Sequence, residues 1–479
     1  MMQNNRNAVA QGVVWSGIER FSVQGVQFVL SFVIARQLSP SDYGLIAMLG
    51  IFMAIAQSFI DSGFSNALIQ KQDRTNVDYS TVFYFNVAVA VVMYFLFLFS
   101  APWISAFYNA PLLTSIIGWV GLNFIISSLA TVQRAKLTVE LNFKLQAYIS
   151  IVAVVISGSM AVWMAYNGYG VWTLVYQTLL NNGITVLLLW LTARWFPLKV
   201  FSWKSFKELF SFGSKLLAGG LLHTIYANMY TLIIGKFFNA TDLGYFSRAF
   251  SITQYPSTNI TGIVTRVTYP VECQLQQNNE LLQQKYFSFI RCIAFIVFPM
   301  MTGLAVLCEP FVRIILTDKW LGVVPYAQIM CAAYMWDPIM RMTWDLLNAK
   351  HRSDYSLKSE ILKKITAFCI LFATIPFGIK IMCVGLILYS LADLFIITRF
   401  AKKLLPAVTL SGIVRKLMPI LLLSSLMGSI VLCFLYYITN AWIELLGGIA
   451  IGCITYATGA YLFKFQELKM IFQLLKNNQ

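Results

Sequence analysis

The feature that most constrains this chain is a succession of long apolar segments. A helix needs roughly 20 consecutive apolar residues to cross a bilayer, and fourteen segments of about that length occur along the 479 residues. Stretches such as 87–99 and 421–437 are apolar on every face, which excludes the alternating strands of an outer-membrane barrel. The sequence therefore predicts an all-α polytopic membrane protein with these approximate spans: 11–35, 43–65, 79–101, 114–132, 148–166, 171–192, 211–234, 243–268, 287–307, 326–347, 360–378, 382–400, 417–438 and 443–463.

Composition excludes the soluble alternatives. The chain is 58% hydrophobic and 11% charged, whereas a soluble domain has about 25% charged residues. A soluble enzyme, a disordered protein and a nucleic-acid-binding protein are all inconsistent with these values. The first segment is not expected to be a cleaved signal peptide, because Glu19 and Arg20 interrupt it. The eight cysteines include no CxxC pair and are expected to be small buried hydrophobes.

The basic residues predict the orientation and account for most of the net charge of +16. With the N-terminus inside, about 21 Lys and Arg residues fall in inside loops and 5 in outside loops. This bias requires an even number of spans with both termini inside. Most of the excess positive charge is therefore a topology signal and a contact for anionic lipids.

Two basic, aromatic-containing linkers on the inside are expected to lie on the inner leaflet as amphipathic segments. They divide the chain into six, six and two spans. The predicted parts are an N-terminal lobe at 1–192, a linker at 193–210, a C-terminal lobe at 211–400, a linker at 401–416, and two further spans with a tail at 417–479.

The two groups of six spans carry a weak internal repeat. At an offset of 200 residues, Ser41-Asp42-Tyr43-Gly44 matches Thr241-Asp242-Leu243-Gly244, and both lie in the outside turn of the first hairpin of their half. Because six is even, both halves enter the membrane from the same side. The expected relation is a pseudo-two-fold axis along the membrane normal, as in transporters with two halves around a cavity.

Fourteen charges remain at membrane depth, where each costs about 2.5–3.5 kcal/mol on the lower insertion scale. Five of the nine cations lie near an inside end and can extend to the interface. The cations are Arg20, Lys215, Arg248, Arg266, Arg291, Arg341, Lys363, Lys364 and Arg399, of which Lys215, Arg266, Lys363, Lys364 and Arg399 are the five near an end. The acids are Glu19, Asp61, Asp337, Asp345 and Asp393.

The first candidates for a functional site are deep in the first and tenth spans. Glu19 and Arg20 are adjacent, so their side chains diverge by about 100° and cannot pair tightly; one is expected to face a cavity. Asp337, Arg341 and Asp345 follow at i, i+4 and i+8 on one helix stripe. They form either a structural ion-pair ladder or a cavity wall whose charges exchange partners between conformations.

Other candidates are single charges in other spans. Arg248 and Arg291 are candidate linings of an anion path, and Asp61 is a further candidate cavity acid. Asp393 suits a proton or sodium site, or equally a helix-packing hydrogen bond. His223 is expected to be a buried histidine with its hydrogen bonds satisfied, or alternatively part of a proton relay.

No catalytic or metal-binding motif accompanies these charges. The sequence has no Walker A loop, HExxH or GxSxG. The outside loops are also short, and the longest, 308–324, has no histidine and no paired carboxylates. An enzyme is therefore not expected, and neither is a cofactor.

Several motifs resemble one family of membrane proteins. RQLSPSDYGLIAM at 36–48, FIDSGFSNALIQ at 59–70, RAKLTVELNFK at 134–144 and DLGYFSRAF at 242–250 are similar to polysaccharide flippases of the multidrug/oligosaccharidyl-lipid/polysaccharide exporter superfamily. The likeness is greatest to the branch of colanic-acid and O-unit exporters, and it extends over most of residues 10–400.

This resemblance implies a function, a location and partners. The substrate would be an oligosaccharide repeat unit on undecaprenyl diphosphate, moved to the outer leaflet of the bacterial cytoplasmic membrane by alternating access. Arg20 and Arg248 would carry the family's cationic cavity, with H⁺ or Na⁺ as a coupling ion. A polysaccharide polymerase and a chain-length regulator would be partners, and nucleic acid would not.

Three alternatives remain open at this point. A cation-coupled multidrug antiporter of the same superfamily would favour an acidic or apolar cavity. A membrane glycan polymerase or ligase would need a large outside loop. A scaffold of a glycan-assembly complex would need no charges at mid-membrane depth.

Overall fold

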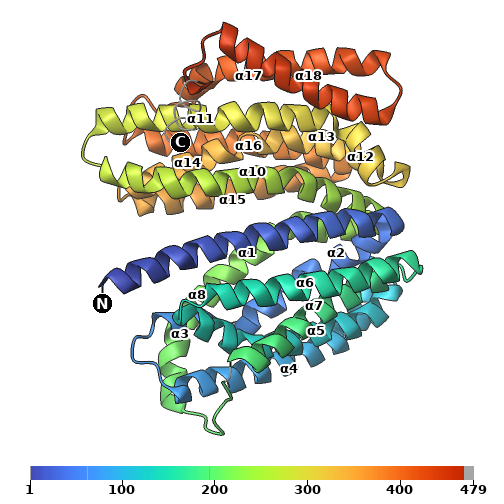
Figure 1. Ribbon diagram of the computed structural model, residues 1–479, viewed down its shortest axis with the longest axis vertical. Helices are drawn as coiled ribbons and strands as arrows, with labels where there is room; N and C mark the ends of the chain where they lie inside the picture. The colour runs from blue at the N-terminus through green and yellow to red at the C-terminus, as the bar shows by residue number, and fades with distance from the viewer. Residues whose placement is uncertain (1, 62, 194, 469–479) are drawn as a thin grey trace. The chain divides into compact units, whose positions relative to one another are not determined.

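The computed structural model describes residues 2–61, 63–193 and 195–468, except for the side chains of residues 2–14, 16, 18–21, 212, 215 and 216. The described residues form eighteen α-helices, two short 3₁₀ helices and no strand (Figure 1). The chain divides into two compact units, Met1–Gly244 and Tyr245–Gln479.

The first unit is a bundle of long helices. Within it α4 packs on α5, both α5 and α6 pack on α7, and α1 lies along α6 (Figure 1). Its core includes Phe64, Tyr79, Phe83 and Trp195, which are all buried. The helices are α1 (Met2–Gln37), α2 (Pro40–Asp61), α3 (Phe64–Gln70), α4 (Asn76–Tyr108), α5 (Leu112–Val139), α6 (Phe143–Tyr166), α7 (Trp172–Ala193), α8 (Trp203–Ala227) and α9 (Met229–Phe237).

The second unit is also all helical, and α10 (Ala240–Gln274) leads into it from the end of the first. Within it α11 packs on α13 and α17, α15 packs on α16, and α17 packs on α18. The buried Tyr286 hydroxyl lies 2.7 Å from the Thr343 hydroxyl and ties α11 to α14. The remaining elements are α11 (Asn279–Val306), α12 (Cys308–Ile315), η1 (Asp318–Trp320), α13 (Val323–Tyr334), α14 (Asp337–Ala349), α15 (Ser353–Thr374), η2 (Ile375–Phe377), α16 (Ile379–Lys402), α17 (Leu410–Tyr437) and α18 (Ala441–Leu462).

The predicted all-α membrane fold is confirmed, and each of the fourteen predicted segments lies on a helix or a broken pair of helices. Nine helices of the described part are long and apolar enough to span a membrane, and ten if α8 and α9, bent by 43°, count as one span. The predicted span 326–347 is divided between α13 and α14, because Pro338 favours a new helix start. The exact number of spans stays a prediction.

A helix begins inside each predicted linker. Residues 195–202 have no helix, and α8 begins at Trp203 rather than near 211, with the Ser202 hydroxyl accepting from the Ser205 amide. In the second predicted linker, α17 begins at Leu410 after a Thr409 cap. Both caps satisfy amides that would otherwise lack a partner at a helix start.

The repeated turn has the same local structure in both copies. Helices end at Gln37 and Phe237 and begin again at Pro40 and Ala240, which keeps the offset of 200 residues. In the first copy Asp42 accepts from the amide and hydroxyl of Ser39. In the second, Asp242 accepts from the side-chain amide of Asn239 and donates its own amide to the Asn239 side chain. Each turn is thus closed by a reciprocal cap.

The two turns touch each other through glycine. A Cβ added to Gly44 would lie 1.7 Å from the Ala240 carbonyl oxygen, and one added to Gly244 would lie 1.9 Å from the Pro40 carbonyl oxygen. The contact is reciprocal, as in an isologous interface. Since backbone meets backbone, no side-chain rotation can make room for a methyl group at either position.

Gly44→Ala should therefore lower the free energy of unfolding by about 3 kcal/mol or more, because overpacking here can be relieved only by moving a helix. Gly50→Ala, on the same helix, is the matched control, since its nearest neighbour is a side-chain oxygen 3.9 Å away. Thermal unfolding of the detergent-solubilised protein measures both. Equal transition temperatures for the two variants would contradict the close contact.

Candidate functional site

The charged stripe predicted in the tenth span lies on α14. Arg341 Nε is 3.5 Å from Asp345 Oδ1, and the guanidinium lies 4.6 Å from the centre of the Trp344 ring. The Arg341 side chain is 55% exposed, whereas that of Asp345 is 10% exposed. Asp337 interacts electrostatically with Arg341 from the first turn of the helix. Arg341 is therefore held in place by an acid and a ring while about half of its side chain stays accessible to an anion.

Asp393 on α16 forms a buried ion pair that the sequence did not predict. Its Oδ1 lies 2.8 Å from Lys363 Nζ of α15, and the side chains are 9% and 6% exposed. Lys363 had been expected to extend to the interface. Asp337 also interacts electrostatically with both members of the pair. An external cation at Asp393 would have to displace this ammonium group.

Glu272, near the end of α10, is a buried acid that the sequence analysis did not select. It is 1% exposed, and neither carboxyl oxygen has a hydrogen-bond partner within the described residues. It interacts electrostatically with Asp345. A buried carboxylate without a partner is costly, which makes Glu272 a candidate for binding a proton. Its position beyond the predicted span 243–268 explains why it was missed.

The structure gives Arg248 and Arg291 different surroundings. Arg248 on α10 is buried, with its guanidinium carbon 5.6 Å from the centre of the Trp320 ring. Arg291 on α11 forms a two-point ion pair with Glu467, in which Nη2 and Oε2 are 3.2 Å apart. The charge of Arg291 is thus already compensated by an acid of the same chain.

The remaining predicted site residues are not gathered with this group. Asp61 ends α2 and accepts a hydrogen bond of 2.6 Å from the Ser65 hydroxyl. His223 on α8 is exposed, so its interpretation as a buried histidine is wrong. Glu19 and Arg20 are on α1, but their side chains lie outside the described residues. Among the described residues, no group of three or more His, Cys, Asp or Glu could hold a metal ion.

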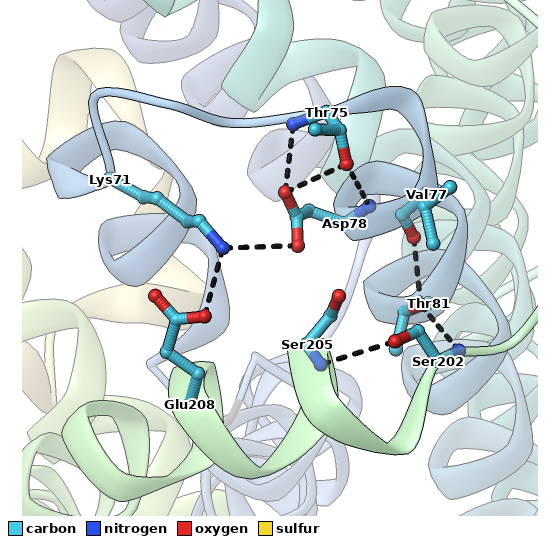
Figure 2. A network of polar contacts seen from close by, with 8 residues as sticks. All are labelled: Lys71, Thr75, Val77, Asp78, Thr81, Ser202, Ser205 and Glu208. Carbon is cyan, nitrogen blue, oxygen red and sulfur yellow. Dashed lines mark hydrogen bonds and ion pairs between the residues drawn. The ribbon is translucent and has the colours of Figure 1, made fainter.

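A second polar network joins the start of α4 to the start of α8 in the first unit (Figure 2). Asp78 completes a capping box with Thr75. Lys71 Nζ lies 3.2 Å from Asp78 Oδ1 and 3.0 Å from Glu208 Oε2, and Figure 2 shows it between the two acids. We call Lys71, Thr75, Asp78 and Glu208 the α4–α8 clamp.

The segment between α7 and α8 is held by the same end of α4. The Leu198 amide donates to the Ser80 hydroxyl at 2.8 Å, and the Ser202 amide donates to the Thr81 hydroxyl at 3.1 Å. These bonds satisfy backbone groups that have no helix to pair with. The predicted linker is therefore fixed against the first unit along part of its length.

The two acids of the clamp shift the titration of Lys71. Burial alone would lower the pKa of Lys71, but its hydrogen bonds to Glu208 and Asp78 outweigh this and raise the pKa above its ordinary value. A raised folded-state pKa means that the contribution to stability is complete below the unfolded pKa and is lost only as the pH rises through the folded value. The ion pairs are therefore intact at neutral pH.

Comparison with known proteins identifies the family. A family profile described as "Polysaccharide biosynthesis protein" matches residues 33–325, more than half of the chain. The chain belongs to this family of polysaccharide biosynthesis proteins. The resemblance inferred from its motifs is thereby confirmed.

Two named relatives match most of the chain. The teichuronic acid biosynthesis protein TuaB of Bacillus subtilis (strain 168) is 25% identical, over 88% of each chain. The lipopolysaccharide biosynthesis protein WzxC of Escherichia coli (strain K12) is 25% identical, over 75% of this chain and 73% of its own.

Solved structures share the fold of this family member. The lipid II flippase MurJ, in an inward closed conformation, matches with a TM-score of 0.70 and 14% identity, over 94% of this chain and 98% of its own. An inward-facing multidrug resistance MATE family transporter of the MOP superfamily matches with a TM-score of 0.59 and 13% identity, over 85% and 98% of the chains. The predicted all-α membrane fold is thus shared with these solved structures.

The clamp predicts different effects for its two acids. Asp78 is 3% exposed and Glu208 is 56% exposed. Asp78→Asn should lower the free energy of unfolding by about 1.5–3 kcal/mol, the range for a hydrogen bond to a charged group. Glu208→Gln is the control and should change it by less than about 1 kcal/mol. Thermal unfolding of both variants in detergent measures the two changes. A larger loss of stability for Glu208→Gln than for Asp78→Asn would contradict the stronger role given to the buried acid.

The buried pair on α15 and α16 predicts strong coupling. Lys363→Met alone leaves Asp393 buried without a partner and should cost about 3–5 kcal/mol. Lys363→Met combined with Asp393→Asn should recover most of that loss, because no uncompensated charge remains. A double-mutant cycle on thermal unfolding measures the coupling. Additive losses in the double variant would show that the two groups do not compensate each other.

Proposed function

We propose that the chain is a flippase for oligosaccharide repeat units linked to undecaprenyl diphosphate. It moves them from the inner to the outer leaflet by alternating access, in the synthesis of a surface polysaccharide such as O-antigen, capsule or exopolysaccharide. The observation that carries the proposal is Arg341, a half-exposed cation oriented by Asp345 and Trp344 on α14. The family match and the shared fold with MurJ support it.

The physical requirement is compensation of the diphosphate. An anion that leaves water for an apolar region needs charged partners or it pays a large desolvation cost. A guanidinium fork matches phosphate oxygens, and oriented arginines can replace water for the headgroup while the lipid tail stays in the bilayer. Arg20, Arg248 and Arg341 are the residues we propose for this role. Arg291 enters it only if its pair with Glu467 opens.

The acidic residues are needed to compensate the arginines when no diphosphate is bound. We propose that Glu19, Asp61, Asp337 and Asp345 act as cavity acids, and that Asp345 re-pairs with Arg341 when the anion leaves. Glu272, beside Asp345, is the proton-binding candidate that the geometry adds. Asp393 and His223 remain weaker candidates for a coupling H⁺ or Na⁺, since Lys363 already compensates Asp393.

The setting follows from the same proposal. We place the chain in the bacterial cytoplasmic membrane with both termini inside, in six, six and two spans. Its partners would be lipid-linked oligosaccharide, membrane lipids, a polysaccharide polymerase and a chain-length regulator. A multidrug antiporter is the alternative, because a MATE transporter shares the fold. The relatives named for polysaccharide biosynthesis favour the flippase.

Translocation by the purified protein tests the role of Arg341. In liposomes carrying an undecaprenyl-diphosphate-linked repeat unit, Arg341→Gln should slow transfer between leaflets about tenfold, because one charge-assisted contact to the diphosphate is lost. Arg313→Gln is the matched control and should stay within about twofold. Arg313 is also about half exposed and also pairs with an acid four residues away, Glu309, but on the short helix α12.

Two results would overturn the proposal. One is equal slowing by the two arginine variants, which would reflect charge alone. The other comes from cells that lack the chain, in which the proposal expects lipid-linked repeat units to build up on the inner leaflet. Unchanged levels of these intermediates together with raised drug sensitivity would favour the antiporter instead. Normal polysaccharide export by Arg20→Ala would remove that residue from the proposed path.

A further inference from the structure

One face of α17 changes from basic to apolar along its length. Arg415, Pro419, Leu422 and Leu426 are spaced by four, three and four residues, which places them on one stripe of the helix. All four side chains are exposed, and so is the neighbouring Lys416. The stripe therefore presents positive charge near the start of α17 and an apolar surface further along it.

This stripe borders two pockets of the second unit that meet each other. A pocket of about 840 Å³ lies at the basic end, between α17 and the first part of α11, on which α17 packs (Figure 1). A pocket of about 670 Å³ lies at the apolar end, where Leu422, Leu426 and Phe463 are exposed in its walls. Both pockets are lined by the same four residues: Arg291, Lys416, Pro419 and Gln466. They are therefore two parts of one groove, which we call the α11–α17 groove.

The groove carries more positive than negative charge. Four basic side chains line its two parts, against two acidic ones. The basic residues are Arg291, Arg415, Lys416 and Lys464, and the acidic residues are Glu280 and Glu467. Because Glu467 is already paired with Arg291, the other three basic residues give the groove its excess positive charge.

The pair with Glu467 fixes Arg291 and leaves it able to bind an anion. A guanidinium has five N–H groups, and Glu467 accepts from Nε and Nη2, so neither bond uses Nη1. The Arg291 side chain is 27% exposed. The segment that carries Glu467 is also held by Phe465, whose ring lies 6.0 Å from that of Phe295 on α11. Arg291 is thus a positioned donor in the wall of the groove.

These walls are suited to a ligand that is anionic at one end and apolar at the other. A free anion would leave the apolar part of the groove unfilled, whereas an uncharged chain would leave the cations uncompensated beside the bilayer. Basic pockets between membrane helices bind the phosphate headgroups of anionic lipids. Both parts of the groove have volumes within the range for small-molecule sites, about 300–1,000 Å³. The orientation predicted from the basic residues places the charged end at the inner leaflet.

We propose that the α11–α17 groove binds one anionic phospholipid of the surrounding membrane. The phosphate lies among Arg291, Arg415 and Lys416, and an acyl chain follows Leu422 and Leu426. This lipid is not cargo: it joins α11, α17 and the segment after α18. The inference goes beyond the proposed flippase function and does not depend on it, because lipid binding is measured without transport.

Titration of phosphatidylglycerol into the detergent-solubilised full chain tests the site. A ligand that binds only the folded chain raises the unfolding temperature. We expect a rise of about 3 °C or more with phosphatidylglycerol and less than about 1 °C with phosphatidylcholine, whose headgroup has no net charge. Each variant is compared with its own lipid-free protein, so a change in basal stability does not enter the result.

A double variant removes the charged end of the site. Arg415→Gln combined with Lys416→Gln should raise the half-saturating phosphatidylglycerol concentration about tenfold or more, because two charge-assisted contacts are lost. Lys402→Gln combined with Lys403→Gln is the matched control and should change it by less than about twofold. Those two lysines are also adjacent and exposed, at the end of α16, but they line neither part of the groove.

A second variant keeps every cation and fills the apolar end. Leu426→Trp should raise the half-saturating concentration about threefold or more, since the loss of even one buried methylene costs about that much affinity. Glycerol 3-phosphate, which has the phosphate without acyl chains, should leave the unfolding temperature unchanged. Equal effects of the two double variants, or equal protection by phosphatidylcholine or glycerol 3-phosphate, would overturn the lipid site. Stronger protection by undecaprenyl phosphate than by phosphatidylglycerol would overturn it too, and would assign the groove to the carrier lipid.

Discussion

The cost of an uncompensated charge in an apolar environment governs this structure. A charge at bilayer depth is stable only if it has a charged partner, an aromatic ring face beside it, or access to water. Three cations of the second unit follow this rule in different ways: Lys363 pairs with Asp393, Arg291 pairs with Glu467, and Arg248 lies against Trp320. Arg341 differs because its partner Asp345 is buried while its own side chain stays half exposed. A residue held in this way can exchange one anion for another.

The same rule operates on neutral backbone groups where helices end. The segment before α8 has no helical hydrogen bonds, and the Ser80 and Thr81 hydroxyls of α4 accept its amides instead. Lys71 then joins the capped start of α4 to Glu208 of α8. Within the first unit, these contacts hold the start of α8 and the segment before it against the start of α4.

Local signals in the sequence predicted much of the fold but only part of the site. Hydropathy located the helices because each apolar run meets the spanning requirement by itself. The Asp337, Arg341 and Asp345 stripe was predictable because all three lie on one helix with fixed spacing. The pair of Lys363 with Asp393 was not, since their contact depends on how α15 packs on α16. Arg134 was predicted to lie on the inside beyond the fourth span, and α5 continues through it to Val139, because hydropathy marks the end of an apolar run and not the end of a helix.

The reciprocal glycine contact has a consequence for assembly. Gly44 faces Ala240 while Gly244 faces Pro40, so each copy of the turn presents the same surface to the other. Such a surface is self-complementary. Two half-length chains with one copy of the turn each could therefore dimerise through the same glycine contact. Fusing the two copies into one polypeptide raises their effective concentration. It also frees the sequences outside the two turns to diverge.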